Sequence, residues 1–465
     1  MDIKFFDLVI KNGLIINADS SFYGDVAINK GKVAVIGNNF KAKNVIDAKG
    51  LYILPGGIDV HTHFDMPFMG TFSSDDFTTG SQAAACGGTT TVIDYAMQAK
   101  GESLNKTICN WHKKSENKTY VDYGFHLGLT DVNEHILNEL KDLSDMGVTT
   151  VKLFMAYNNT LRCPDLLMLE VFNRLKMYSI LPMLHCENGD IVEYLSKKLL
   201  KENKTAAFYH SIAHSPVAEA EAIFRAVTYS DMFKLPIYVV HLSSKEGLQV
   251  VYDALNKGEK VFVETCPQYL LLSECLYENN FIEASKYVMS PPLRDKASID
   301  ALWIGISKGV INVIATDHCP FFLKQKEMGS NDFTKIPNGV PGVENRLAIV
   351  FSEGVNKGRI TKEKFVEICC LNPAKLTGLY PQKGLIAPNF DADLVMIDPD
   401  KKWKITKGAL SQNVDYTPFE GLEITGSVVN VFLRGNQIVG DGSFIGSSVR
   451  GKYLKRRKVF GYETY

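Results

Sequence analysis

The chain has 465 residues, 45% of them hydrophobic and 22% charged, which is typical of a globular protein with one large domain and a smaller one, or with three small domains. A formal net charge of -1 gives no reason to expect a nucleic-acid partner, and no segment reaches the length of about 18 unbroken apolar residues that a membrane span needs. Nine cysteines without CxxC pairs, and an N-terminus without a signal-peptide core, predict reduced thiols in a cytosolic protein.

Both ends of the chain have the alternating pattern of short β-strands. Residues 7–17, 24–37 and 43–56 alternate β-branched and polar residues around Asn-Gly and Lys-Gly turns. Residues 391–400 and 427–442 repeat this pattern near the other end. The pattern predicts one small β-sandwich domain that is built from both termini.

The middle of the chain, from about residue 55 to 375, alternates short apolar runs with helical stretches such as 165–179 and 216–233. Eight runs have the length of a buried strand: GGIDVHTHF, TTTVIDYA, YGFHLGL, TTVKLFMAY, LPMLHCE, PIYVVHL, KVFVETC and INVIATDH. Eight strands alternating with helices predict an α/β fold with a TIM-type (β/α)8 barrel. The alternative, a doubly wound sheet, needs a glycine-rich turn after its first strand, whereas Gly56 and Gly57 precede a strand.

These patterns divide the chain into four parts. Residues 1–54 and 376–440 are the two parts of the predicted β-sandwich, and residues 55–375 are the barrel. Residues 441–465 are a basic, aromatic tail, for which we expect either solvent exposure or contact with a neighbouring subunit.

Five residues with the chemistry of metal ligands each stand at the end of a hydrophobic run: His61, His63, His185, His241 and Asp317. The carboxyl ends of barrel strands form one face, so we expect these side chains to meet. The first two histidines are two positions apart on a strand, and their side chains therefore point the same way. Neutral imidazoles and a carboxylate suit zinc-like divalent ions. The pattern predicts a two-metal hydrolase.

The remaining histidines lack this uniform position, and we interpret most of them as structural or surface residues. His318 shares the strand end of Asp317 but is expected to face the other way, because side chains alternate along a strand. The others are His112, His126, His135, His210 and His214.

Lys152 ends a hydrophobic run of the same kind, Val148 to Phe154. One interpretation is a lysine in a salt bridge, because a buried, unpaired ammonium is costly. The balance of charges at the site favours a second interpretation of Lys152. Four neutral histidines and one aspartate offer only a single negative charge to two divalent cations. A desolvated amine with a lowered pKa that captured carbon dioxide would be a carbamate, whose two oxygens could bridge two metals.

The segments around these residues resemble a known family. GGIDVHTHFDMPFMG, VKLFMAY, HCENGD, VVHLSS, ETCPQYL, MSPPLR, ATDHCPF and IPNGVPGVE are together similar to the D-hydantoinase/dihydropyrimidinase branch of the cyclic amidohydrolases, in the amidohydrolase superfamily. The resemblance runs from the N-terminal β segment to about residue 440. A single HxH pair is a weak signal, whereas eight blocks in order are specific.

The resemblance implies a TIM barrel with a small β-sandwich, a binuclear zinc centre and a homotetramer. One metal is expected on His61, His63 and Asp317, and the other on His185 and His241. Lys152, as N6-carboxylysine, and a hydroxide are expected to bridge the two metals. Manganese or cobalt would suit the same ligands.

The implied reaction is hydrolytic ring opening of a cyclic ureide to an N-carbamoyl amino acid. The bridging hydroxide is the nucleophile, and Asp317 first accepts a proton and then donates it to the leaving nitrogen. Tyr157 is expected to stabilise the tetrahedral oxyanion, and the backbone groups of Ser290 and Asn338 to pair with the ring imide.

Neighbouring families are disfavoured by particular residues. Dihydroorotases have an arginine two positions after the HxH pair to hold the substrate carboxylate, where this chain has Asp65. Met66, Phe68 and Phe154 are candidates for an apolar pocket around a 5-substituent, although ordinary barrel packing would explain each of them equally well. Such a pocket disfavours allantoinase, which needs polar contacts to a ureido group. A non-catalytic structural relative of dihydropyrimidinase is disfavoured because all six ligand positions are filled. Dihydrouracil and 5-monosubstituted hydantoins both remain open as substrates.

Overall fold

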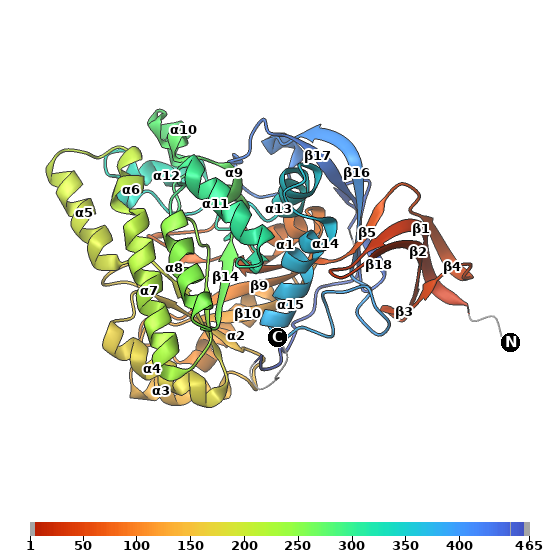
Figure 1. The fold of residues 1–465 in the computed structure, drawn as a ribbon, viewed down its shortest axis with the longest axis horizontal. Helices are drawn as coiled ribbons and strands as arrows, with labels where there is room; N and C mark the ends of the chain where they lie inside the picture. Colours follow the sequence, from red (N-terminus) through yellow and green to blue (C-terminus); the bar gives the residue numbers. More distant parts are fainter. Residues whose placement is uncertain (1–4, 447, 460–465) are drawn as a thin grey trace.

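The computed structural model describes residues 5–446 and 448–459 (Figure 1). Eight parallel strands form the barrel at its centre. All eight predicted runs carry one of these strands, so the barrel prediction is confirmed. In chain order the strands are β6 (Gly57–Thr62), β9 (Thr89–Met97), β10 (Asp122–Gly128), β11 (Thr150–Phe154), β12 (Leu181–His185), β13 (Ile237–Val239), β14 (Val261–Thr265) and β15 (Val313–Ile314).

The ring closes between its first and last strands through residues that follow β15. The His63 amide donates to the carbonyl of His318 at 2.9 Å, and the His318 amide donates to the carbonyl of His61 at 3.3 Å. Thr62 and His318 form a parallel bridge at this seam. The closure therefore lies at the end of the barrel where the predicted ligands stand.

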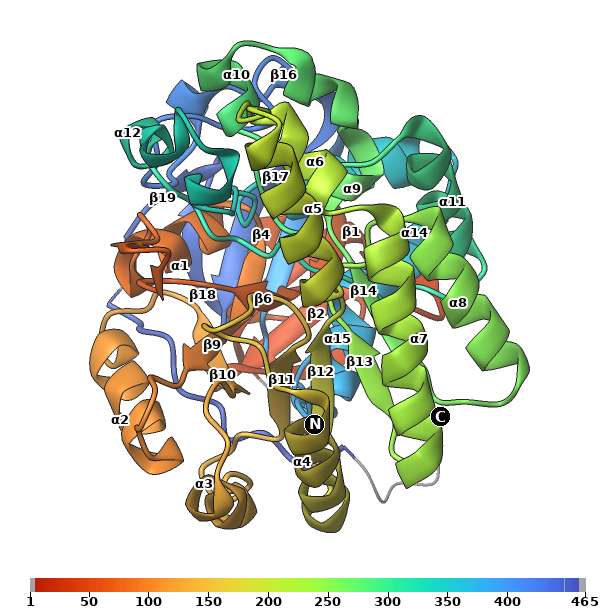
Figure 2. The ribbon, with the colours of Figure 1, turned by 90° about the vertical axis from the view of Figure 1, so that its left-hand side faces the viewer.

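Helices surround the strands on the outside, as Figure 2 shows for α2, α4, α7 and α8. The helical stretches predicted from periodicity correspond to α4 and α7, and the Ser215 side chain caps α7 by accepting from the Ala218 amide ahead of Pro216 at the first turn. The helices are α1 (Phe77–Cys86), α2 (Leu104–Ser115), α3 (Glu134–Glu139), α4 (Asp165–Tyr178), α5 (Gly189–Lys201), α6 (Phe208–Ala213), α7 (Pro216–Phe233), α8 (Lys245–Asn256), α9 (Pro267–Leu271), α10 (Phe281–Ser285), α11 (Lys296–Ser307), α12 (Leu323–Lys326), α13 (Arg346–Val350), α14 (Lys362–Val366) and α15 (Asn372–Leu376).

A separate mixed sheet of nine strands combines both ends of the chain, as the sequence predicts. Its strands run in the order β19-β18-β17-β16-β5-β1-β2-β3, with β4 paired to β1. Figure 1 shows β1 to β4 at the side of the molecule away from the barrel helices. These strands are β1 (Phe6–Ile16), β2 (Ser21–Asn29), β3 (Lys32–Gly37), β4 (Ala42–Asp47), β5 (Tyr52–Pro55), β16 (Leu394–Lys404), β17 (Glu423–Leu433), β18 (Asn436–Gly440) and β19 (Ser443–Phe444); the short ribbon β7 (Pro67–Phe68) and β8 (Thr71–Phe72) lies outside this sheet.

The Asn-Gly pair at 12–13, which the sequence predicts to be a turn, is instead a bulge inside β1. The pairing of β1 with β2 shifts register between Ile10 and Gly13. Residues before the bulge pair with β4 and residues after it pair with β5. A Cβ on Gly13 would lie 2.4 Å from the Ile53 side chain, so the strand needs glycine for this close approach. The predicted Lys-Gly turn at Lys30 is confirmed, because it joins β2 to β3 with positive φ at both residues.

The C-terminal tail packs against the closed, amino-terminal end of the barrel. The Tyr123 amide donates to Lys452, and the Leu454 amide donates back to Tyr123. Leu454 joins the cluster that fills the barrel interior, and the Arg456 guanidinium, itself buried, donates to the hydroxyl of Thr150 at 3.0 Å. The described part of the tail thus contacts its own barrel; residues 460–465 lie outside the described residues.

A buried ionic cluster joins the mixed sheet to the barrel. The Lys383 ammonium lies 2.6 Å from Asp122 and 3.0 Å from Asp391, and it also pairs with Asp393. Arg434 pairs with Asp122 from the β17–β18 hairpin. Burial lowers the pKa of Lys383, but the three carboxylates outweigh burial and raise it. The lysine therefore stays charged at the centre of the acidic group.

None of the helices in the described ranges is long and apolar enough to cross a membrane.

Replacing Lys383 with Met should destabilise the fold strongly, because three buried carboxylates would lose their central cation. We expect a loss of about 3–5 kcal/mol, measured as a lower midpoint of thermal unfolding at a fixed scan rate. Lys32→Met is the matched control: it removes a half-exposed partner of Asp391 and should cost less than about 1 kcal/mol. Equal losses in the two variants would contradict a central role for Lys383.

Candidate active site

The barrel brings the six predicted ligand residues to one end of the ring. His61 lies near the end of β6 and His63 just beyond it; Lys152 lies within β11, and His185 ends β12. His241 and Asp317 follow β13 and β15 by two and three residues. Their chain positions are far apart, and they meet because parallel strands place their carboxyl ends on one face.

One group of candidate ligand atoms converges around Asp317. Its Oδ1 lies 3.0 Å from His61 Nε2 and 3.1 Å from His63 Nε2. Lys152 Nζ lies 2.9 Å from the same His61 nitrogen. His61, His63 and Asp317 each offer one ligand atom, and the three atoms lie within 4.8 Å of one another. This spacing fits a single divalent cation.

A second pair of imidazoles lies beside the first group. His185 Nδ1 and His241 Nε2 face each other at 2.9 Å, and the ring centroids of His61 and His241 are 5.5 Å apart. His185, His241 and Lys152 all line the same cavity. The structure therefore places two ligand groups next to each other with Lys152 between their strands.

Burial keeps most of these imidazoles neutral, which is the form that binds cations. Burial lowers the pKa of His63 to about 3, lowers that of His185, and lowers that of His241 well below its usual value. For His61, burial and Lys152 lower the pKa, but Asp317 and Glu264 outweigh them and raise it. Burial also raises the pKa of Asp317, but His61 and His63 outweigh it, so the carboxylate stays ionised.

Lys152 is 2% exposed, and within the described part of the chain no ion pair joins it to a carboxylate. Its Nζ lies 4.3 Å from the centre of the Tyr95 ring and next to His61. Burial lowers the pKa of this amine despite the opposing charges of Asp317 and Glu264. The structure therefore does not support the interpretation of Lys152 as a lysine in a salt bridge, because it has no carboxylate partner in the described ranges.

Two buried glutamates that the sequence analysis did not single out orient the histidines. Glu264 accepts from His61 Nδ1 at 2.6 Å, and Glu187 accepts from His185 Nε2 at 2.9 Å. Each bond keeps a proton on the ring nitrogen that faces the glutamate. The other ring nitrogen, His61 Nε2 or His185 Nδ1, therefore presents its lone pair to the site. The other oxygen of Glu187 pairs with His214 Nδ1 at 2.9 Å. In the sequence, the sign of a role for Glu264 was that a carboxylate stands inside the apolar run of a predicted buried strand.

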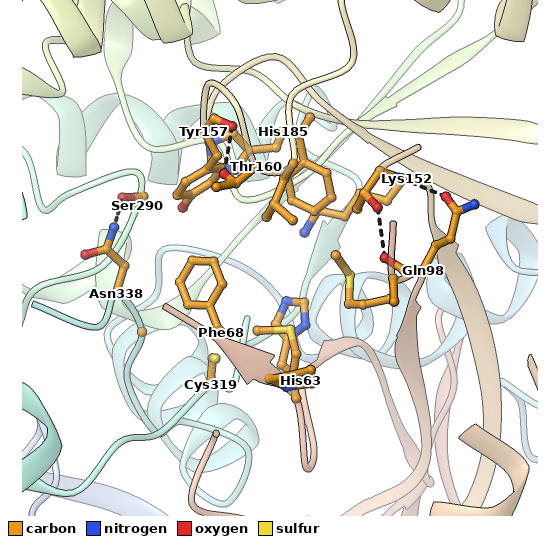
Figure 3. A pocket seen from close by; sticks show the side chains of 18 of the residues that line it. His63, Phe68, Gln98, Lys152, Tyr157, Thr160, His185, Ser290, Cys319 and Asn338 are labelled. Carbon is orange, nitrogen blue, oxygen red and sulfur yellow. Dashed lines mark hydrogen bonds between the residues drawn. The ribbon is translucent and has the colours of Figure 1, made fainter. Parts of the chain in front are cut away.

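The site opens into a cavity of about 810 Å³, whose wall carries the predicted substrate contacts (Figure 3). Tyr157, Ser290 and Asn338 all line it, and Asn338 Nδ2 donates to Ser290 Oγ at 2.9 Å. Burial raises the pKa of Tyr157, so its hydroxyl keeps its proton. The predicted apolar residues lie on the same wall: Met66, Phe68 and Phe154.

Three site residues have left-handed backbone conformations that non-glycine residues rarely adopt. The φ angles are 64° for Tyr157, 41° for His241 and 53° for Asp317. Such strain persists where the surrounding structure fixes it, and it concentrates at functional sites. The conformations direct these three side chains into the cavity, which all of them line.

Asp65, which stands where dihydroorotases have an arginine, is not among the residues that line the cavity. Its carboxylate lies 3.5 Å from the ammonium of Lys114, whose side chain does line the cavity. The negative charge of Asp65 is therefore paired with a cation. His318 faces away from Asp317 as predicted, with its Nε2 at 3.0 Å from Asp75.

Comparisons with known proteins show the family of this chain. The model of the amidohydrolase family matches residues 52–438. The chain is 45% identical to the D-hydantoinase of Geobacillus stearothermophilus, with 97% of this chain and 96% of that protein covered. It is 42% identical to the D-hydantoinase of Ralstonia pickettii, with 97% and 99% covered. The crystal structure of the dihydropyrimidinase from Brevibacillus agri is similar with a TM-score of 0.95 and 44% identity, covering 97% of this chain and 98% of that chain.

Replacing Glu264 with Gln should weaken binding of a divalent cation, because His61 would lose the charged acceptor that orients it and raises its basicity. We expect the dissociation constant for Zn²⁺ to rise by about 10–100-fold, measured by competition with a chromophoric chelator. Glu202→Gln, at an exposed carboxylate paired only with Lys204 in the described ranges, should leave the constant unchanged. An unchanged constant for Glu264→Gln would contradict the orienting role.

Proposed function

The chain belongs to the amidohydrolase family, and we propose that it is a metal-dependent hydrolase that opens cyclic ureide rings to N-carbamoyl amino acids. The proposed substrates are 5,6-dihydropyrimidines such as dihydrouracil and 5-monosubstituted hydantoins. One observation carries the proposal: four histidines, Asp317 and Lys152 converge beside a cavity that Tyr157, Ser290 and Asn338 line. Lys152 has no carboxylate partner among the described residues. The names of the similar proteins support the substrate class.

The donors fit two divalent cations, which we propose to be zinc. His61, His63 and Asp317 would hold one ion, and His185 with His241 the other. The fit rests on the converging nitrogens and oxygen, and on the burial that keeps most of the imidazoles neutral. Such ions, when bound, lower the pKa of a water molecule and polarise an amide carbonyl.

We further propose that Lys152 becomes N6-carboxylysine and bridges the two ions. Its neutral amine would attack carbon dioxide, form an N–C bond and release a proton, which leaves an anionic carbamate. Burial, the lowered pKa and the lack of a carboxylate partner among the described residues support this chemistry. The carbamate would add the negative charge that four imidazoles and one aspartate do not supply.

The chain's own residues account for the proton transfers of ring opening. Water attacks the ring carbonyl, and Asp317, ionised at neutral pH, accepts its proton. The protonated Tyr157 hydroxyl donates a hydrogen bond to the tetrahedral oxyanion. Asp317 then returns the proton to the ring nitrogen as the C–N bond breaks. The backbone groups of Ser290 and Asn338 hold the imide side of the ring during these steps.

The apolar part of the cavity fits the substituent of a 5-substituted ring. Phe68 packs edge-on against Tyr157 with ring centroids 5.7 Å apart, and Phe154 packs against His185 at 5.9 Å. An apolar substituent that packs on this wall would keep the substrate ring close to Tyr157. A ureido group would leave its polar atoms unpaired against these rings.

The proposal includes a homotetramer in the cytosol. Nine free cysteines, seven of them buried, support a reducing compartment.

Ring opening should be compared on four substrates with the zinc-loaded protein. We expect turnover of dihydrouracil, a 5-monosubstituted hydantoin or both, with allantoin and dihydroorotate slower by about 100-fold, because their polar side groups find no partner in an apolar wall. Product formation can be followed as N-carbamoyl amino acid. Preference for allantoin would indicate an allantoinase instead, and no turnover of the first two would refute the proposal.

Replacing Lys152 with Ala should remove both metal and activity, because the bridging anion would be lost. We expect metal content measured by mass spectrometry to fall below one ion per chain and kcat/KM to fall by at least about 1000-fold. Lys114→Ala, which changes a cavity-lining lysine already paired with Asp65, is the control and should keep two ions. Full metal content in the Lys152 variant would contradict the bridge.

A further inference from the structure

A second buried lysine lies beside the cavity and takes no part in the mechanism above. Lys326 ends the short helix α12, in the loop that follows Asp317, and its side chain is fully buried. Within the described ranges no ion pair joins it to a carboxylate, and burial lowers its pKa to about 7. A buried ammonium without a counter-ion is costly, so its retention calls for a specific set of acceptors.

Those acceptors are three backbone carbonyls. Lys326 Nζ donates to Val288 at 2.8 Å, to Pro337 at 2.7 Å and to Gly339 at 2.8 Å. An ammonium has three donors, and all three are used. Three carbonyl oxygens that point at one spot repel one another, so the N–H donors of Lys326 are what allow them to converge.

The carbonyls belong to the two segments that carry the proposed imide contacts. Val288 stands two residues before Ser290, while Pro337 and Gly339 flank Asn338. Two other bonds join the same segments: the Gly339 amide donates to the Val288 carbonyl at 3.0 Å, and the Asn338 side chain donates to Ser290 at 2.9 Å (Figure 3). The Lys326 side chain is thus a third link between these two segments.

We propose that Lys326 is a positioning residue that sets the separation and orientation of the Ser290 and Asn338 backbones, and thereby the fit of the substrate ring. This inference rests on the proposed function, since the ring imide is the group these backbones would hold. Lys326 is not among the residues that line the cavity, and in the described ranges its ammonium bonds only to backbone carbonyls. Its loss should therefore weaken substrate binding more than it slows the chemical step.

The test is a comparison of Lys326→Met with the wild-type protein on whichever ureide the wild type opens. Met fills similar space but donates no hydrogen bond, so the two segments lose the link through Lys326. We expect KM to rise about tenfold with kcat within threefold and metal content unchanged. Lys324→Met, at an exposed lysine of the same helix, is the matched control and should match the wild type. If the Met variant is not recovered folded, Lys326→Gln, which keeps an amide donor, is measured in its place.

A double-mutant cycle separates positioning from general stabilisation. If Lys326 acts through the Asn338 segment, the KM of Lys326→Met with Asn338→Ala should exceed that of the worse single variant by no more than about twofold. Additive effects would overturn the inference. So would an unchanged KM, or a fall in kcat with loss of metal at constant KM.

The same measurements keep the two proposals apart. A wild-type protein that opens neither dihydrouracil nor a hydantoin refutes the proposed function. A wild type that opens one of them, with a Lys326 variant of unchanged KM, refutes only the positioning role.

Discussion

The seam between the first and last strands of the barrel is the contact on which the site depends. His63 and His61 exchange backbone hydrogen bonds with His318, and this exchange fixes Asp317 against the two histidine side chains. Without that closure, the group that converges on Asp317 would lie on two separate edges of an open sheet. The barrel thus creates the site by backbone pairing, before any side chain contributes.

The buried polar groups at this site are tolerated because burial neutralises most of them or a hydrogen-bonding partner stabilises them, with Lys152 as the exception. Burial keeps most of the imidazoles neutral, and the two glutamates behind them, Glu187 and Glu264, accept their outer protons. Asp317 stays ionised between two histidines. Lys152 is the group left without a carboxylate in the described ranges, and that imbalance is what a carbamate would remove.

Stability and chemistry are placed at opposite ends of the barrel. At the amino-terminal end, Leu454 and Arg456 of the tail fill the interior, and the Lys383 cluster ties the mixed sheet to β10. At the carboxyl end, strained residues such as Tyr157 line a cavity. The interior is filled by packed side chains, and such packing can hold unusual backbone conformations at the open end.

The sequence by itself determined the barrel, the sheet built from both ends of the chain, and the set of six residues that converge at one end of the barrel, because strand periodicity and residue type are local properties. It did not determine that Asn12 lies in a bulge, that Asp65 pairs with Lys114, or that Glu264 orients His61. Each of these depends on which distant segment packs alongside. Lys326 is the clearest case: in the sequence it is one lysine in a polar loop, and only tertiary structure brings three carbonyls from two other segments to its side-chain nitrogen.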